Sequence, residues 1–128
     1  MPTQAERTEA TRSRLVTTAR HHFAEKGFAA TSTEEILAEA DVSRGAMYHH
    51  FEDKQALFRA TFEAVEADLT ARVREAAISS SNPVDQLRQG FAAYLDQCRN
   101  PEVQRIVLLD GPTVLGWDIW HAIDERYV

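Results

Sequence analysis

The chain has 128 residues, with 14 Lys and Arg against 20 Asp and Glu, which gives a formal net charge of −6. This length suits one domain, or a small domain with part of a second. The acid excess argues against a protein that coats nucleic acid without specificity. The single cysteine, Cys98, excludes an internal disulfide. Because residues 1–14 lack the apolar run of a signal peptide and no run approaches the roughly 20 apolar residues of a membrane helix, we expect a cytoplasmic protein without membrane contact.

The first expected helix spans residues 11–26. Leu15, Ala19 and Phe23 recur at a spacing of four and form one apolar stripe. Gly27 is a natural residue to follow the helix, since glycine readily ends helices. The residues before position 11 are expected to be solvated and disordered, because chain termini are commonly untethered.

Two short helices are expected next. Ser32 or Thr33 can cap a helix over residues 34–40, and the acidic residues that follow favour a helix start. A tight connection at residues 41–42 leads to Ser43, which can cap a third helix that ends near residue 50 or 51. We expect the apolar side chains of these three helices to share one core: Leu15, Phe23, Phe28, Ile36, Val42, Met47 and Phe51.

The second half also has a helical pattern, with no strand-like alternation. Asp53 can cap a long helix over residues 54–77, which the polar segment 79–83 ends. Further helices are expected over residues 83–98, 103–109 and 114–127, with breaks at Asn100-Pro101 and at residues 110–112. The predicted fold class is therefore all-α.

Residues 31–54 carry the functional signal. Two short helices joined by a few residues have the helix-turn-helix geometry of DNA-binding proteins. At 100° per residue, the side chains of Arg44, Gly45, Tyr48 and His49 fall within an arc of about 140°, while Met47 and Phe51 lie together elsewhere. The second arc can pack on the other helices, which leaves the first arc free to enter a DNA groove.

The residue types on the free arc suit a DNA surface. Arg44 can bind a guanine edge or a phosphate, and Gly45 permits close backbone approach. Tyr48 and the two histidines that follow can donate hydrogen bonds to phosphates, and Lys54 stands at a helix start that favours an anion. An N-terminal arm that carries Arg7, Arg12 and Arg14 into the minor groove is an alternative to the disordered start.

The run from Val42 to Phe51, followed by Lys54 and Leu57, resembles the signature of the TetR family of transcriptional regulators, as does the upstream run from Ala24 to Ser32. The resemblance implies an all-helical repressor that binds a palindromic operator in double-stranded DNA as a homodimer and releases it when a small ligand binds. Two positions depart from the family pattern: Asp41 stands where Gly is usual, and Leu37 is larger than usual. The candidate DNA contacts are Ser32, Thr33, Ser43, Arg44, Gly45, Ala46, Tyr48, His49, His50 and Lys54.

The resemblance divides the chain into a DNA-binding domain over residues 1–53 with a flexible N-terminus and a partial ligand-binding domain over residues 54–128. Family members usually continue well beyond this length and dimerise through their last two helices, so we expect a truncated chain whose own dimerisation stays open. The second half contains more aromatic residues than the core of the first three helices needs. They can belong to the hydrophobic core or line a pocket for a small apolar or aromatic effector. The candidates are Phe62, Phe91, Tyr94, Cys98, Trp117 and Trp120.

Other functions are less well supported. His49 and His50 are adjacent and point about 100° apart, so they do not form a metal site, whose helical ligands are spaced i, i+4. No metal or cofactor is expected, and Cys98 is expected to be structural. Paired carboxylates, a Ser/His/Asp set and a Gly-rich phosphate loop are missing from the sequence, which argues against an enzyme. A helical ligand-binding or adaptor protein that has lost DNA binding remains the alternative.

Overall fold

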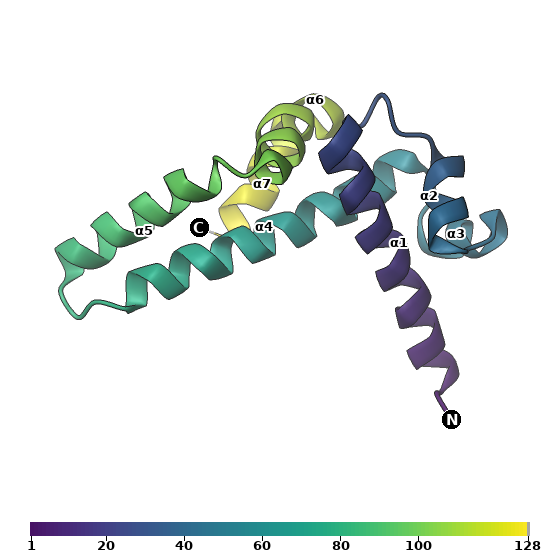
Figure 1. Cartoon of the computed structure of the whole chain (residues 1–128), viewed down its shortest axis with the longest axis horizontal. Coiled ribbons are helices and arrows are strands. Elements are labelled where there is room, and N and C mark those ends of the chain that lie inside the picture. Colours follow the sequence, from purple (N-terminus) through teal and green to yellow (C-terminus); the bar gives the residue numbers. More distant parts are fainter. Residues whose placement is uncertain (128) are drawn as a thin grey trace.

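The computed structural model describes residues 1–127 as a succession of helices (Figure 1). No strand occurs within these residues, so the all-α prediction is confirmed. The elements in chain order are α1 (Gln4–Lys26), α2 (Thr33–Ala40), α3 (Arg44–His50), α4 (Lys54–Ile78), α5 (Pro83–Gln97), the π-helical segment η1 (Val103–Asp110), α6 (Gly111–Leu115) and α7 (Trp117–Tyr127).

The first three helices form a head around one apolar core. Met47 is fully buried and Phe51 is 5% exposed, so the face predicted to pack inward does so. Phe23 meets Phe58 of α4 at a ring-centroid distance of 5.2 Å, which joins the head to the next helix. Phe28 was expected to be buried but is only partly so. The predicted core residues that are buried are Leu15, Phe23, Ile36, Val42, Met47 and Phe51.

The long helix α4 connects the head to the rest of the molecule (Figure 1). It begins beside α2 and α3, crosses α1, and continues to a turn from which α5 returns alongside it. The segments η1, α6 and α7 then fold back over the middle of α4. Phe58, Phe62 and Val65 of α4 are almost completely buried there, together with Ile106 of η1 and Ile123 of α7. The predicted end of this helix at residue 77 is one residue short.

The expected disorder before residue 11 is wrong, because α1 begins at Gln4. Thr3 and Glu6 form a reciprocal capping box: the Thr3 hydroxyl accepts from the Glu6 N–H at 3.1 Å, and the Thr3 N–H donates to the Glu6 carboxylate at 3.3 Å. Such a box satisfies two of the free N–H groups of a helix start. The result is a helix of 23 residues that extends beyond the head.

The predicted break at residues 110–112 is also wrong, because η1 passes directly into α6. Pro112 stands in the first turn of α6, where a missing N–H breaks no helical hydrogen bond. Gly111 is buried, and a Cβ there would lie 2.8 Å from Phe62 and 2.9 Å from Trp120. The break falls instead at Gly116, whose φ of 84° suits glycine, so α7 starts at Trp117 rather than at 114.

Helix α5 carries apolar side chains at helical spacing, but they do not face the core. Leu87 is 76% exposed, Phe91 62% and Leu95 51%. The contact of α5 with α4 is made instead around Gly90, where an added Cβ would lie 3.4 Å from the Ala77 Cβ. An apolar face of α5 is therefore open to solvent in this chain.

Candidate nucleic-acid interface and ligand cavity

The turn between α2 and α3 is built as the sequence indicated, despite its aspartate. Asp41 adopts a left-handed backbone with φ 55° and ψ 51°, which Asp tolerates better than most residues. Its N–H and that of Val42 both donate to the Leu37 carbonyl, the second at 3.1 Å. Leu37 itself is 8% exposed, so this larger residue is accommodated in the core. The turn therefore keeps α3 at the surface of the head.

Helix α3 presents one polar face to solvent. Ser43 caps the helix by accepting from the Ala46 N–H at 3.1 Å, which leaves its O–H able to donate. Arg44, Gly45, Tyr48 and His49 are exposed, and Tyr48 is 52% exposed. Met47 anchors the opposite side of the helix. The four exposed residues are those that the helical wheel placed on one arc.

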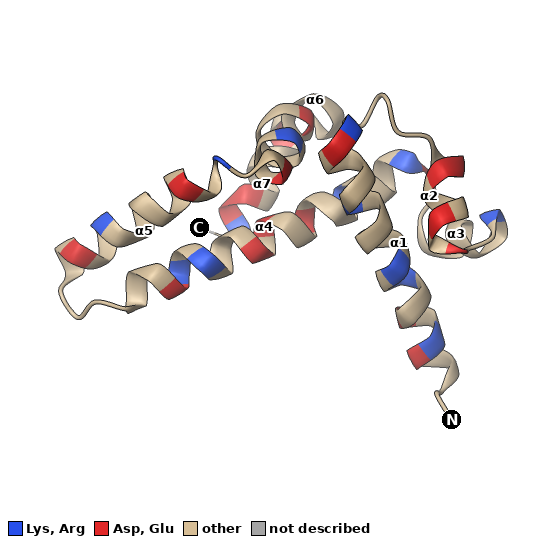
Figure 2. Ribbon diagram, in the orientation of Figure 1, with Lys and Arg blue, Asp and Glu red and all other residues tan. Residues whose placement is uncertain are grey.

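Arg44 is held by an acidic partner within the head. Its guanidinium donates to the Glu34 carboxylate at 2.9 Å. This contact raises the pKa of Arg44, while hydrogen bonds from its own backbone and from Arg44 lower the pKa of Glu34. Figure 2 shows acidic residues along α2 and both basic and acidic residues along α1. This contact uses one of the five guanidinium N–H donors, so Glu34 competes with an anion for Arg44.

The remaining candidates lie at the margins of this face. Ser32 caps α2 by accepting from the Glu35 N–H at 3.1 Å, and Thr33 is the first residue of that helix. Burial, followed by the charges of His49 and Arg12, lowers the pKa of His50. The Lys54 ammonium lies 4.1 Å from the centre of the Phe28 ring, and burial lowers its pKa. Lys54 therefore lies against the head and remains partly exposed.

The start of α1 contributes residues to this surface, among them Arg7, which the sequence placed near DNA only under the alternative of an N-terminal arm. A hollow of about 190 Å³ lies between α1 and α3. Because α1 is ordered from Gln4, Arg7 is fixed beside the exposed face of α3, and the capping-box spacing of Thr3 and Glu6 is the sequence signal that could have shown this. The hollow is lined by Gln4, Arg7, Thr8, Thr11, Ala46, His49 and His50.

The head is fastened to the second half through charged contacts. Arg20 of α1 donates to both oxygens of Glu102 at 2.8 Å and forms an ion pair with Asp68 of α4 at 2.7 Å; the hydrogen bond with Glu102 raises the pKa of Arg20. Farther along, the Asp110 carboxylate accepts from the Phe28 N–H at 2.8 Å. The second half of α1 and the loop after it are thus tied to residues at the two ends of η1.

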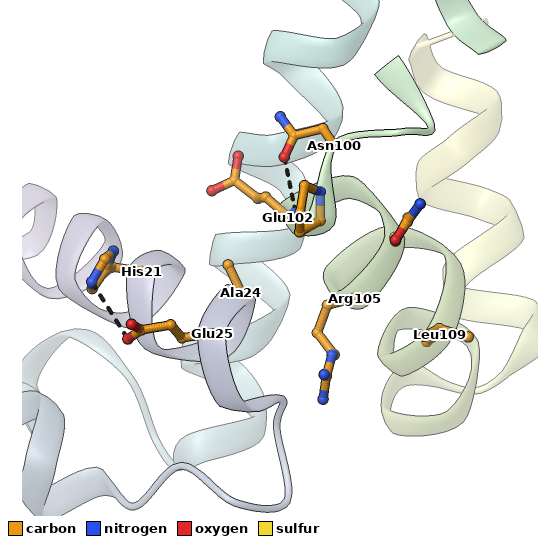
Figure 3. A pocket seen from close by; sticks show the side chains of 9 residues that line it. His21, Ala24, Glu25, Asn100, Glu102, Arg105 and Leu109 are labelled. Carbon is orange, nitrogen blue, oxygen red and sulfur yellow. Dashed lines mark hydrogen bonds and ion pairs between the residues drawn. The ribbon is translucent and has the colours of Figure 1, made fainter. Parts of the chain in front are cut away.

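An open hollow of about 560 Å³ lies between these two contacts (Figure 3). His21 and Glu25 of α1 form an ion pair on one side, and Arg105 reaches toward α1 from the other. The Arg105 guanidinium donates to the Lys26 carbonyl at 3.3 Å. Six of its nine lining residues are polar or charged, so this hollow is a junction of mixed character between the head and the body, residues 54–127, rather than an apolar pocket.

The six predicted ligand-binding residues do not line one cavity. Phe62 is fully buried in the core, and Trp120 donates its indole N–H to the Val107 carbonyl at 2.9 Å. Trp117 is 62% exposed and stacks on Trp120 at the surface. Tyr94 lines a cavity, Phe91 lines the groove beside it, and Cys98 is half-buried near Tyr94.

The cavity that contains Tyr94 lies between α4, α5 and α7 and has a volume of about 210 Å³. Two carboxyl groups, those of Glu66 and Asp124, belong to it, and sequence reasoning missed both. The signal for Glu66 was its position on an apolar stripe of α4, four residues after Phe62 and three before Leu69. The lining residues are Glu66, Leu69, Thr70, Val73, Tyr94, Asp124 and Tyr127.

Two negative findings apply to residues 1–127. Nowhere in this range do three His, Cys, Asp or Glu side chains gather as metal ligands. None of the helices formed by these residues combines the length and apolar character needed to cross a membrane.

The chain matches two family models, described as "Bacterial regulatory proteins, tetR family" over residues 15–61 and "Tetracyclin repressor-like, C-terminal domain" over residues 84–128. It is 39% identical to the HTH-type transcriptional regulator CymR of Pseudomonas putida over 97% of its length, and 30% identical to the transposon Tn10 TetC protein of Escherichia coli over 98%. It spans 63% of each of these relatives.

Solved structures agree with these matches. A TetR-family transcriptional regulator from Pectobacterium atrosepticum superposes with a TM-score of 0.78 at 41% identity, over 90% of this chain and 59% of that one. Both halves of the sequence and the arrangement of the helices thus lead to one assignment: the chain belongs to the TetR family of bacterial regulatory proteins.

Proposed function

We propose that this chain is the DNA-binding part, with a portion of the effector-binding part, of a transcriptional repressor rather than of an enzyme. The observation that carries the proposal is the exposed face of α3, on which Arg44, Gly45 and Tyr48 lie opposite the buried Met47. A helix of this kind enters the major groove with its first residues toward the base edges. Arg44, Gly45 and Ala46 then read bases, and the other contacts fix the position of the protein.

Phosphate contacts surround this reading face in the proposed complex. Ser32, Thr33 and Ser43 stand at helix starts, Tyr48, His49 and His50 follow along α3, and Lys54 begins α4. Arg7 joins this group because α1 holds it beside α3. Each cationic phosphate contact releases counterions, so each contributes close to one unit to the salt dependence of binding.

The experiment selects DNA from a random pool and measures its binding to the chain by fluorescence anisotropy over a range of salt concentrations. Arg44→Ala is expected to weaken binding to the selected sequence by about 5- to 150-fold and to relax base preference. Three other changes, Lys54→Ala, Tyr48→Ala and Arg7→Ala, should weaken binding to all DNA sequences alike. The two that remove a cation, at Lys54 and Arg7, should each lower the slope of the salt dependence by about one unit. Arg88→Ala, an exposed change on α5, is the control. Equal losses on selected and random DNA for Arg44→Ala would restrict Arg44 to phosphate contact.

The alternative is a helical ligand-binding or adaptor protein that no longer binds DNA. The acid excess and the occupation of Arg44 by Glu34 favour it. Glu34→Gln separates the two functions, because it frees Arg44 and removes a negative charge near the phosphates. A DNA-binding protein should gain affinity on this substitution, whereas wild type and variant that both fail to select any sequence would support the adaptor.

A regulator of this family further requires a partner copy and an effector, and both belong to the proposal. We expect a cytoplasmic homodimer on a palindromic operator, with half-sites about one helical turn apart. A small apolar or aromatic effector would bind in the second half, to which residues 54–128 contribute. The contacts of Arg20 with Glu102 and with Asp68 of α4, and of Phe28 with Asp110 of η1, support communication, since a ligand that shifts these elements also shifts the head.

A further inference from the structure

The cavity between α4, α5 and α7 contains a buried carboxyl group with an unused acceptor. Glu66 is 2% exposed, and its Oε1 atom has no hydrogen-bond partner among the described residues. Burying an ionised carboxylate without a partner is unfavourable, and natural proteins pair nearly all such atoms. A bound molecule that donates a hydrogen bond or supplies a positive charge to Glu66 Oε1 would account for this buried carboxyl group.

The groups that face Glu66 are acidic or aromatic. Asp124 of α7 lies beside it, Tyr94 approaches from α5, and Tyr127 approaches from α7. Cys98 lies near Tyr94. None of the described residues that line the cavity is basic, and Arg126, which is close in sequence, donates to Glu63 instead. The cavity therefore has a negative potential that no side chain of its lining neutralises.

We propose that this cavity binds an organic cation, in the form of the ammonium group of a small hydrophobic amine. Carboxylates supply the opposite charge, and the faces of two tyrosines attract a cation through their ring quadrupoles. A metal ion is a poorer occupant, because the described residues supply no third His, Cys, Asp or Glu ligand. An anionic effector is excluded by charge.

The space around the cavity defines the rest of the ligand. At about 210 Å³ the cavity can hold the ammonium group together with one small apolar substituent, such as a single ring. An apolar groove of about 590 Å³ along α4 and α5 shares Val73 and Tyr94 with it. A longer apolar substituent would extend into this groove, beside Leu87 and Phe91. This inference rests on the proposed function in one respect: it names the chemical class of the effector.

The test compares three probes with the same ring and different charge, namely benzylammonium, benzyl alcohol and benzoate. Isothermal titration of the 128-residue chain is carried out with each at pH 7.5. Benzylammonium is expected to bind about ten-fold or more tightly than benzyl alcohol, and benzoate most weakly. Equal binding of alcohol and amine, tighter binding of benzoate, or no binding of the amine at millimolar concentration would overturn the proposal.

Two substitutions assign the effect to this cavity. Glu66→Gln and Asp124→Asn should each weaken the binding of benzylammonium by about ten-fold and leave the binding of benzyl alcohol unchanged. Glu75→Gln, an exposed change on α4, should alter the binding of neither probe. Unchanged amine affinity in Glu66→Gln would refute the site. If that variant does not fold, as judged by circular dichroism, the three probes on the wild-type chain decide.

Anisotropy on selected DNA separates this inference from the function on which it rests. Intact DNA binding without amine binding refutes the cation site alone. Amine binding without DNA binding supports the site and refutes the DNA-binding function.

Discussion

Burial of Glu66 makes the stability of the fold depend on pH in the opposite sense to an ordinary surface carboxylate. Burial and the neighbouring Asp124 raise the pKa of Glu66 from 4.5 to about 7. The folded state therefore holds the proton more tightly than the unfolded state. Below pH 4.5 both states are protonated and the group has no net effect, whereas above pH 7 both are ionised and the folded state is disfavoured. At 1.36 kcal/mol per pKa unit, the full loss is about 3 kcal/mol.

The measurement is urea unfolding of wild type and Glu66→Gln from pH 4.5 to 8.5. The difference in unfolding free energy should change in favour of Glu66→Gln as pH rises, mostly between pH 4.5 and 7, and level off near pH 8 at about 3 kcal/mol above its low-pH value. Glu75→Gln, the exposed control, should show no such trend. A difference between wild type and Glu66→Gln that does not vary with pH would mean that Glu66 is hydrated in the folded state.

Three further predictions concern the fold. Arg20→Met should lower the unfolding free energy by about 2–4 kcal/mol, because it leaves the Glu102 carboxylate partly buried without its bidentate partner, while Arg88→Met should have little effect on urea unfolding. Met47→Ala should cost about 2–4 kcal/mol by opening a cavity under α3, measured by thermal unfolding. Asp41→Ala should cost about 1 kcal/mol and Asp41→Gly much less, since only glycine adopts the left-handed turn freely; equal effects on the melting temperature would argue against strain at this turn.

The head could be predicted because its elements are specified locally. Ser32, Ser43 and Asp53 each accept a backbone N–H at the start of the helix that they cap, as their sequence positions indicated. The burial of Met47 and the exposure of Tyr48 follow from helical spacing alone. Helical spacing could not predict that Arg44 pairs with Glu34. This contact joins two helices whose relative placement depends on the packed core.

The second half was predicted less well because its helices are defined by tertiary packing. Leu87, Phe91 and Leu95 form an apolar stripe in the sequence and yet face solvent, while α5 approaches α4 through Gly90. A single sequence does not tell which side of an amphipathic helix has a partner. Gly111 was also misread because of tertiary packing. Its residue type suggested a helix break, whereas a glycine is needed there because Phe62 and Trp120 leave no room for a Cβ.

The cavity residues lie between these two cases. Glu66 interrupts an apolar stripe, which is a sequence signal, but its meaning depends on Asp124, 58 positions later and on another helix. Because one carboxyl group comes from α4 and the other from α7, a cation bound between them would draw the two helices together. Helix α4 also carries Asp68, which holds Arg20 of the head. Glu66, which destabilises the fold above neutral pH, is thus two residues from Asp68, whose contact with Arg20 positions α1. Occupation of the cavity would stabilise the body and alter the support of the head through the same turn of α4.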